Sequence, residues 1–294
     1  TFISARILSQ LAGPAPAPSA APASSAMAAP ADAAATPVDV PVAIAFRVGL
    51  GGSNGVDNNG GATSSSHSGD ILTTGQNTPG ALIQTIGGGG GRAVVDITAP
   101  TGALLGPIDV TLGGTNGTNE RGGAIVRDHA GVLRTTGNLS TGAILQSVGG
   151  GGGSASVTLQ GDGAPGAVVT SSLGATGGTG LDGGAISATF AGGITTTGDH
   201  AVGLLAQSVG AGGGEVRMSG VGVASVGLGG TGAASGNGGA VSLTNTGNIV
   251  TSGLRSYGIV LQSIGGGGGA VFGAPSSATL TLNTGNAGDG GAIS

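Results

Sequence analysis

Several residue types are missing from this chain or scarce in it. Among its 294 residues there is no cysteine, no tryptophan and no lysine, so all eight basic residues are arginine. Without cysteine there are no disulfides, no thiolate chemistry and no cysteine-type zinc sites. The net charge of −5 leaves no basic face, which argues against nucleic-acid binding. No run of 18 apolar residues is present, so no membrane-spanning helix is predicted.

Glycine, in contrast, is very abundant, with 69 residues beside 12 prolines. The chain has no Gly-X-Y triplet repeat, which excludes collagen. Its mean hydropathy of +0.34 is too high for disorder driven by charge. Glycine costs about 1 kcal/mol per residue in a helix interior, so long helices are also disfavoured. The remaining Val, Ile, Leu and Thr residues favour β-structure.

Four segments of the chain repeat the same phrase, in which a Thr-Thr-Gly or Thr-Ser-Gly step precedes a GAILQSV-like run and a glycine-rich pentad. The glutamine of this phrase recurs at spacings of 62, 61 and 55 residues, at Gln84, Gln146, Gln207 and Gln262. The pentads begin at Gly87, Gly149, Gly210 and Gly265. A GGA triplet recurs in phase with them, at Gly60, Gly122, Gly183, Gly238 and Gly290. Two markers in phase predict repeat units at about 60–121, 122–182, 183–237 and 238–289, with a fifth starting at 290.

Within a unit, apolar and polar residues alternate with the period of a β-strand. In the second unit Ile144, Gln146 and Val148 fall on one face, and Ala143, Leu145 and Ser147 on the other. Such short strands cannot bury a core alone, but stacked repeats can. The prediction is an all-β fold, a parallel β-helix or β-solenoid of four 52–62-residue repeats over residues 42–294. With rungs of roughly 20 residues, each unit would hold two or three rungs, about 12 in all and about 60 Å of rod.

The N-terminal region has a different composition. Residues 12–41 hold 7 of the 12 prolines, with much Ala and Ser. Proline cannot donate to a β-ladder, so residues 1–41 are predicted as a Pro/Ala-rich linker or insertion, mostly disordered. Ile7–Gln10 resembles a decayed ILQS strand, in which case the Pro/Ala stretch would replace one pentad and one strand. Two alternatives to a solenoid stay open, a glycine-rich polyproline-II bundle and full disorder.

Neither the glycine pentads nor the one calcium-like motif predicts a binding site. A phosphate-binding loop needs a Lys, a Ser or Thr and a following helix, and the pentads lack this combination. Residues 177–182 match the calcium-binding pattern GGxGxD, but the equivalent positions of other units do not form a column of Asp. No catalytic, cofactor-binding or metal-binding residue is therefore predicted.

The histidines do not form a column of ligands either. His67 and His129 occupy equivalent positions, but Phe190 and Asn245 follow them in the later units, and His200 lies in a predicted turn. We predict surface or turn histidines. No Gly-x-Ser-x-Gly nucleophile elbow accompanies them.

The four repeated glutamines are the main polar feature. They are interpreted as an internal polar column, whose amides bond to each other or to turn backbones as buried polar groups must. The alternative is an exposed amide stripe that recognises a ligand. If each unit spans two or more rungs, the glutamines cannot stack directly on one another.

The repeated phrase resembles a known family. Leu205–Gly210 and Val260–Gly265 are similar to the AQSIGGGGG-type repeats of passenger regions in very large Gram-negative autotransporters. The resemblance covers residues 60–294, with a weaker extension back to Pro41. It implies a right-handed parallel β-helix, exported through the outer membrane and displayed at the cell surface as an adhesin or biofilm component. The family's C-terminal translocator barrel is not among these residues, so contact with the membrane is expected only through that absent part of a longer parent.

The function expected is therefore a non-catalytic structural or adhesive passenger segment without a cofactor. Its partner would be a host or bacterial surface ligand, and its location the cell surface or extracellular space, anchored to the outer membrane in the parent. One alternative is a surface polysaccharide-degrading β-helix enzyme, although the 13 carboxylates are scattered and no pair such as Asp96 and Asp109 can be placed together from sequence. The other is a glycine-rich low-complexity surface protein without a solenoid.

A solenoid end exposes unpaired backbone groups, which template further pairing. The sequence ends at Gly290–Ser294, the opening of a fifth unit, and is expected to be a fragment that associates through its solenoid ends. Sedimentation velocity at rising concentration should detect this association, and limited proteolysis should first remove the N-terminal 40 or so residues. A chain that stays monomeric at high concentration would contradict the stacking argument.

Overall fold

The computed structural model describes residues 2–8, 44–99, 105–161, 167–232, 234–283, 285–286 and 288–294. All regular elements within these ranges are β-strands. In the same ranges no helix is long and apolar enough to cross a membrane. The Pro/Ala-rich stretch predicted as a disordered linker lies, from residue 9 to residue 43, outside the described residues.

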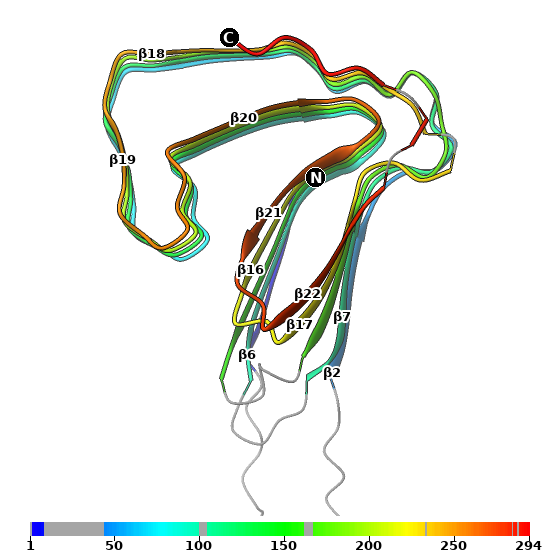
Figure 1. Ribbon diagram of the computed structural model, residues 1–294, viewed down its shortest axis with the longest axis horizontal. Coiled ribbons are helices and arrows are strands. Elements are labelled where there is room, and N and C mark those ends of the chain that lie inside the picture. Colours follow the sequence, from blue (N-terminus) through cyan, green and yellow to red (C-terminus); the bar gives the residue numbers. More distant parts are fainter. Residues whose placement is uncertain are drawn as a thin grey trace, which may run out of the picture.

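The strands stack as five parallel sheets, which we number in the order in which one repeat visits them (Figure 1). Sheet 1 contains β3 (Thr63–His67), β8 (Ile125–His129), β13 (Ile186–Phe190) and β18 (Val241–Asn245). Sheet 2 contains β4 (Ile71–Thr73), β9 (Leu133–Thr135), β14 (Ile194–Thr196) and β19 (Ile249–Thr251). Sheet 3 contains β5 (Ala81–Ile86), β10 (Ala143–Val148), β15 (Leu204–Val209) and β20 (Ile259–Ile264).

Sheets 4 and 5 each have a fifth strand. Sheet 4 contains β1 (Phe2–Leu8), β6 (Gly90–Thr98), β11 (Gly152–Gln160), β16 (Gly213–Ser219) and β21 (Gly268–Gly273). Sheet 5 contains β2 (Ile44–Leu50), β7 (Leu105–Leu112), β12 (Val168–Leu173), β17 (Val223–Leu228) and β22 (Ser277–Leu282). The predicted all-β fold with stacked parallel strands is confirmed.

Each repeat makes one coil. In sheet 3, Gln146 pairs with Gln84 on one side and with Gln207 on the other, and neighbouring residues keep the same register. The predicted rung of roughly 20 residues, with two or three rungs per unit, is wrong. The strands within one repeat pack through their side chains, and their backbones pair only with the equivalent strands of the next repeat. One coil therefore holds five strands and runs the full length of a repeat.

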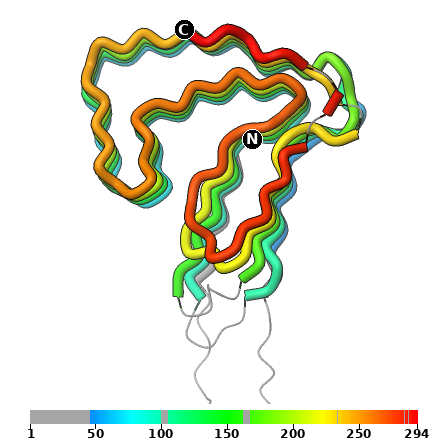
Figure 2. Tube along the Cα trace, viewed as in Figure 1, coloured from blue at the N-terminus to red at the C-terminus, as the bar shows by residue number. Residues whose placement is uncertain are grey.

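The contour of a coil folds back on itself, as the end-on views show (Figures 1 and 2). Sheets 1, 2 and 3 enclose one lobe, called lobe A, and sheets 4 and 5 enclose a second, called lobe B. Leu133, Leu145 and Phe190 belong to the core of lobe A, and Val157 and Val226 to that of lobe B. The two lobes meet along a seam between sheets 3 and 4, so that both faces of sheet 3 are covered.

The packing explains the alternation read in residues 143–148. Ala143 and Leu145 face the core of lobe A, while Ile144 packs in the seam beside Val202 and Leu205. All six residues of β10 are buried. Two faces that both bury side chains need small or medium-sized aliphatic residues, which agrees with the aromatic content of only 2%.

The glycine pentads form the arch that connects sheet 3 to sheet 4. Gly152 has a φ of +131°, a left-handed conformation that L side chains rarely adopt. A Cβ at Gly152 would also overlap the carbonyl oxygen of Gly213 in the next coil. A Cβ at Gly149 would overlap the carbonyl oxygens of Leu181 and Asp182. The arch therefore needs glycine both for its backbone angles and for the close approach of neighbouring backbones.

The strand at the N-terminus corrects two sequence-based expectations. Phe2–Leu8 lies inside the range predicted as linker, yet it forms β1 and pairs with β6. Ile7 pairs with Ile97 and Leu8 with Thr98, both in sheet 4. The interpretation of Ile7 and Leu8 as a copy of the ILQS strand, which belongs to sheet 3, is wrong. A short apolar run is compatible with several sheets, and only its pairing partner distinguishes them.

At the other end, residues 288–294 continue along the edge of sheet 1. The backbone N–H of Val241 donates to the carbonyl of Ala292, and that of Gly238 donates to the carbonyl of Asp289. Ile293 forms a parallel bridge with Val241. The fifth GGA triplet thus follows the same path as the four before it.

Replacement of an arch glycine should destabilise the fold. We expect Gly152→Ala to lower the free energy of unfolding by at least about 2 kcal/mol, because the new Cβ meets the backbone of Gly213 in a strained conformation. Gly61→Ala is the control, since a Cβ there meets nothing within 4 Å, and it should stay within about 0.5 kcal/mol. Urea unfolding followed by circular dichroism measures both, and equal effects would contradict the role of the arch.

Candidate functional site

The four repeated glutamines form a continuous ladder of amides in the seam. The Nε2 of Gln84 donates to Oε1 of Gln146, Nε2 of Gln146 donates to Oε1 of Gln207 at 2.8 Å, and Nε2 of Gln207 donates to Oε1 of Gln262. Gln146 and Gln207 are completely buried. The structure thus places an internal polar column here, and not an exposed amide stripe. The expectation that the glutamines cannot stack directly is wrong, because one repeat is one coil.

A serine follows three of the four glutamines, and it joins the two sequence markers. The hydroxyl of Ser147 donates to the carbonyl of Gly123 at 2.8 Å and accepts the backbone N–H of Gly184, also at 2.8 Å. Ser208 repeats this pattern with Gly184 and Gly239 one coil later. The third and fourth GGA triplets are therefore each hydrogen-bonded to the serine of their own coil and to that of the preceding one. The sequence shows the two motifs in phase but not this contact.

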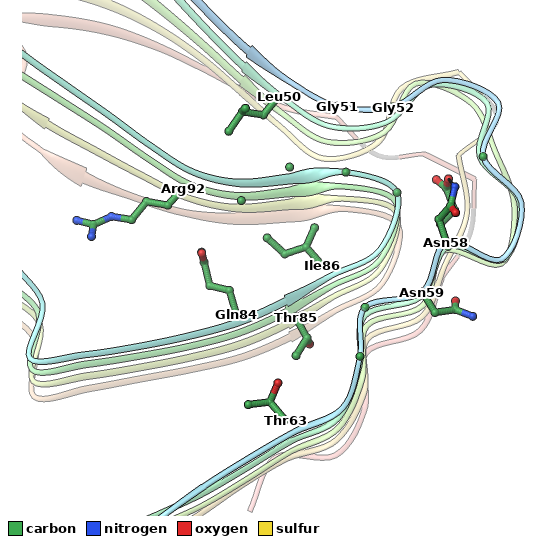
Figure 3. A pocket seen from close by; sticks show the side chains of 18 of the residues that line it. Leu50, Gly51, Gly52, Asn58, Asn59, Thr63, Gln84, Thr85, Ile86 and Arg92 are labelled. Carbon is green, nitrogen blue, oxygen red and sulfur yellow. Dashed lines mark hydrogen bonds between the residues drawn. The ribbon is translucent and has the colours of Figure 1, made fainter. Parts of the chain in front are cut away.

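A cavity of about 1170 Å³ lies at the N-terminal end of the described coils. Figure 3 shows Gln84 and Arg92 on one side of it and Asn58 and Asn59 on the other. Glu120, at the end of the first repeat, also lines this cavity and is only 3% exposed. Burial raises the pKa of Glu120, while a hydrogen bond from Nδ2 of Asn58, at 3.5 Å, acts in the opposite direction.

A buried ion pair lies in the seam, between two residues of β16. Arg217 donates to Oε2 of Glu215 through Nη2 at 2.7 Å and Nε at 3.0 Å, and its Nη1 donates to the carbonyl of Leu139 in the preceding coil at 2.8 Å. Ser154 donates to the other carboxylate oxygen of Glu215 at 2.8 Å. The guanidinium also lies over the ring of Phe272, 5.2 Å from its centroid. This cluster connects three coils and both lobes.

Neither glutamate of this chain is predicted as a site residue from the sequence. Glu120 and Glu215 are the only two in the sequence, and they are 3% and 0% exposed. Glutamate is almost never fully buried without a partner. Their scarcity was the one signal available, but without the register nothing indicated that they face inward.

The histidines differ from expectation. His67 and His129 stack across two coils, with ring centroids 5.3 Å apart. His67 is exposed, but His129 is only 2% exposed and faces the interior of lobe A, so the prediction of a surface or turn position is wrong for His129. Alternate residues of β8 face the core, and His129 falls on that side. His200 lies half-buried in a turn, where burial and then Arg255 lower its pKa.

Next to His129 lies a buried arginine. Nη2 of Arg127 is 3.2 Å from Nδ1 of His129, and Nη1 of Arg127 donates to the hydroxyl of Ser65 at 2.6 Å. Arginine cannot accept a hydrogen bond, so Nδ1 is the acceptor and the ring is neutral. Burial lowers the pKa of His129 most, and the charge of Arg127 lowers it further.

The carboxylates weighed as catalytic or metal-binding candidates are dispersed. Asp96 lies in sheet 4 and Asp109 in sheet 5, where Asp109 forms an ion pair with Arg47 at 3.1 Å. Asp182, from the GGxGxD match, lies 3.3 Å from Arg121 and accepts the backbone N–H of Asn237. Within the residues described, no group of three or more His, Asp or Glu side chains is placed to hold a metal ion.

Comparisons with protein-family models, with curated proteins and with solved structures found no match.

Removal of one amide from the glutamine ladder should be costly. Gln146→Leu leaves Nε2 of Gln84 and Oε1 of Gln207 without their partners in a buried seam. We expect a loss of about 2–4 kcal/mol in the free energy of unfolding. Gln160→Leu is the matched control, because Gln160 is exposed, and its effect should stay within about 0.5 kcal/mol. Chemical denaturation measures both, and a neutral Gln146→Leu would show that the ladder does not stabilise the fold.

The ion pair in the seam predicts that substitutions of its two residues have non-additive effects on the free energy of unfolding. Glu215→Gln leaves the buried guanidinium of Arg217 without its counter-charge and should cost about 3–5 kcal/mol. The double variant Glu215→Met with Arg217→Met should recover most of this loss. Arg47→Met breaks the exposed pair with Asp109, in which the Arg47 side chain is 85% exposed, and should cost at most about 1 kcal/mol. Thermal unfolding of the single and double variants of Glu215 and Arg217 gives a double-mutant cycle. Additive effects of the two single substitutions would contradict the coupling between these residues.

The lowered pKa of His129 predicts that the folded protein loses stability in acid. Its pKa is lowered in the folded protein, whereas an unfolded histidine titrates near 6.5. The unfolded chain therefore binds the proton first, and stability falls as the pH drops through about 6.5 towards the lower folded pKa. His129→Phe, which copies Phe190 of the next coil, should remove this part of the pH dependence. Unfolding curves between pH 8 and pH 5 test it, and an unchanged slope in the variant would contradict the assignment.

Proposed function

We propose that this chain is a non-catalytic, structural and adhesive passenger segment of a bacterial autotransporter, displayed on the cell surface or secreted. In this proposal the four 52–62-residue repeats form a right-handed solenoid. The observation that carries the proposal is the in-register stacking of equivalent residues over successive coils. A stack of this kind is a rigid spacer that presents the same outer surface several times.

The distribution of polar groups also supports a non-catalytic role. The buried groups with the strongest chemistry contact other groups of the chain itself, as the Gln146 ladder and the Glu215–Arg217 pair do. The outer positions carry small hydroxyl side chains in columns across the coils. One exposed column contains Thr74, Thr136, Thr197 and Ser252. Weak contacts repeated along such a column add up to useful avidity when the ligand is also repeated on a surface.

A binding assay with cells tests the adhesive role. The purified chain, coupled to fluorescent beads, should bind bacterial or host cell surfaces. Thr136→Lys combined with Thr197→Lys introduces two charges in the exposed column and should lower binding at least about tenfold without a change in the melting temperature. Thr111→Lys, at an exposed position of sheet 5, is the matched control and should bind like the unmodified chain. Absence of binding to either cell type would contradict an adhesive function.

A second candidate is a surface enzyme that degrades polysaccharides. One observation favours it, namely the end cavity that contains a buried carboxyl group, Glu120, with a raised pKa. A raised pKa suits a general acid, but glycoside hydrolysis generally uses two carboxyl groups. Incubation with pectic and other acidic polysaccharides, followed by a reducing-end assay, distinguishes the two candidates. Turnover that is lost in Glu120→Gln would replace the adhesive proposal with the enzymatic one.

A further inference from the structure

Asparagine is followed directly by glycine at four positions of this chain, Asn54, Asn59, Asn116 and Asn237. Such a step is chemically reactive, because the backbone nitrogen of the glycine can close a five-membered ring with the side-chain amide carbon, and glycine has no side chain to hinder it. All four asparagines are exposed. Access to solvent therefore does not distinguish the four steps, but their hydrogen bonds do.

At two of these steps the neighbouring coil holds both reacting groups. Oδ1 of Asn59 accepts the backbone N–H of Arg121 at 2.8 Å, and the N–H of Gly60 donates to the carbonyl of Arg121 at 2.7 Å. Asn237 and the glycine after it make the same two bonds to Asp289, at 2.9 Å and 2.8 Å. Both bonds must break before the glycine nitrogen can reach the side chain, so these two steps react only after a local opening of the fold.

The other two steps lie at equivalent positions of the loop that connects sheet 5 to sheet 1. Asn54 and Asn116 have φ values of +54° and +53°, in the left-handed region that asparagine tolerates better than most residues. Within the described part of the chain, the N–H groups of Gly55 and Gly117 donate to no acceptor, and the side-chain amides of the two asparagines make no hydrogen bond. Neither reacting group is therefore held by the fold.

We propose that Asn54 and Asn116 are sites of spontaneous deamidation, with water as the second reactant. The backbone nitrogen of the following glycine attacks the side-chain amide carbon. A new C–N bond forms, the bond to the side-chain NH2 group breaks, and ammonia leaves with the proton of the glycine N–H. Water then opens the resulting succinimide, adding its hydroxyl to one ring carbonyl carbon and its proton to the ring nitrogen. Opening at the side-chain carbon gives aspartate, and opening at the main-chain carbon gives isoaspartate.

Each reaction adds one negative charge to an outer loop. Aspartate suits the backbone there, since Asp57 in the same loop has a φ of +55°. Isoaspartate instead lengthens the main chain by one carbon between two bridges that join the first two coils, Ser53 with Thr115 and Val56 with Thr118. The isoaspartate product therefore also displaces at least one of these bridges.

Peptide mapping of the full chain tests the proposal. The folded protein is incubated at mildly alkaline pH and digested in acid, and mass spectrometry with fragment ions measures deamidation at each of the four steps over time. We expect Asn54 and Asn116 to react at least about tenfold faster than Asn59 and Asn237, because the latter two must first break two hydrogen bonds. The chain incubated in concentrated urea is the control, and there all four steps should react at similar rates.

Matched variants give a second readout, the ammonia released by the folded chain. Asn54→Gly combined with Asn116→Gly copies Gly177, the left-handed residue at this position of the third coil, and should remove most of the release. Asn59→Asp copies Asp182, whose Oδ1 accepts a backbone N–H of the next coil in the same way, and should leave the release unchanged. Equal rates at the four steps of the folded chain, faster reaction at Asn59, or undiminished release from the double variant would each overturn the proposal.

Discussion

The structure depends on one constraint, the parallel pairing of each residue with its equivalent one repeat away. Adjacent parallel strands lie about 4.8 Å apart, so any side chain that recurs in the sequence contacts its own copy. Every column must therefore be compatible with itself. Amide side chains satisfy this requirement, because each one both donates and accepts, as Gln146 does between Gln84 and Gln207. Glycine satisfies it in the arch, where neighbouring backbones approach too closely for a Cβ.

The same constraint explains the low charge content. A charged residue repeated in every unit would form a column of like charges at the spacing of the strands, which is unfavourable. Charges instead occur with opposite signs at equivalent or nearby positions of neighbouring coils. Arg47 pairs in register with Asp109 and forms an ion pair with it, and Arg121 forms another with Asp182 one coil further along. The 7% of charged residues is thus a consequence of the stacking.

The folding back of the coil creates two buried environments, the seam that contains Arg217 and the interior of lobe A that contains Arg127. Because sheet 3 lies between lobe A and sheet 4, polar groups in the seam are buried and need partners. There Arg217 donates to Glu215 and to the carbonyl of Leu139 in the preceding coil. Arg127 lies on the other side of sheet 3, inside lobe A, where the described chain offers a hydroxyl and an imidazole but no carboxylate. The two buried arginines thus differ in their partners, since Arg217 contacts a carboxylate and Arg127 contacts a hydroxyl and an imidazole.

The sequence by itself determined the β-class, the phase of the repeats and the alternation within strands such as Ala143–Val148, because like residues 52–62 positions apart must stack for any of them to be buried. It indicated that the glutamines belong to one column. Only the tertiary structure decided how long a rung is and which sheet β1 joins. It also decided that Glu120, Arg127 and His129 face inward. Local alternation gives two faces to every strand but does not say which face is covered. That choice depends on how the five strands of one coil fold around two lobes, through side-chain contacts that leave no period in the sequence.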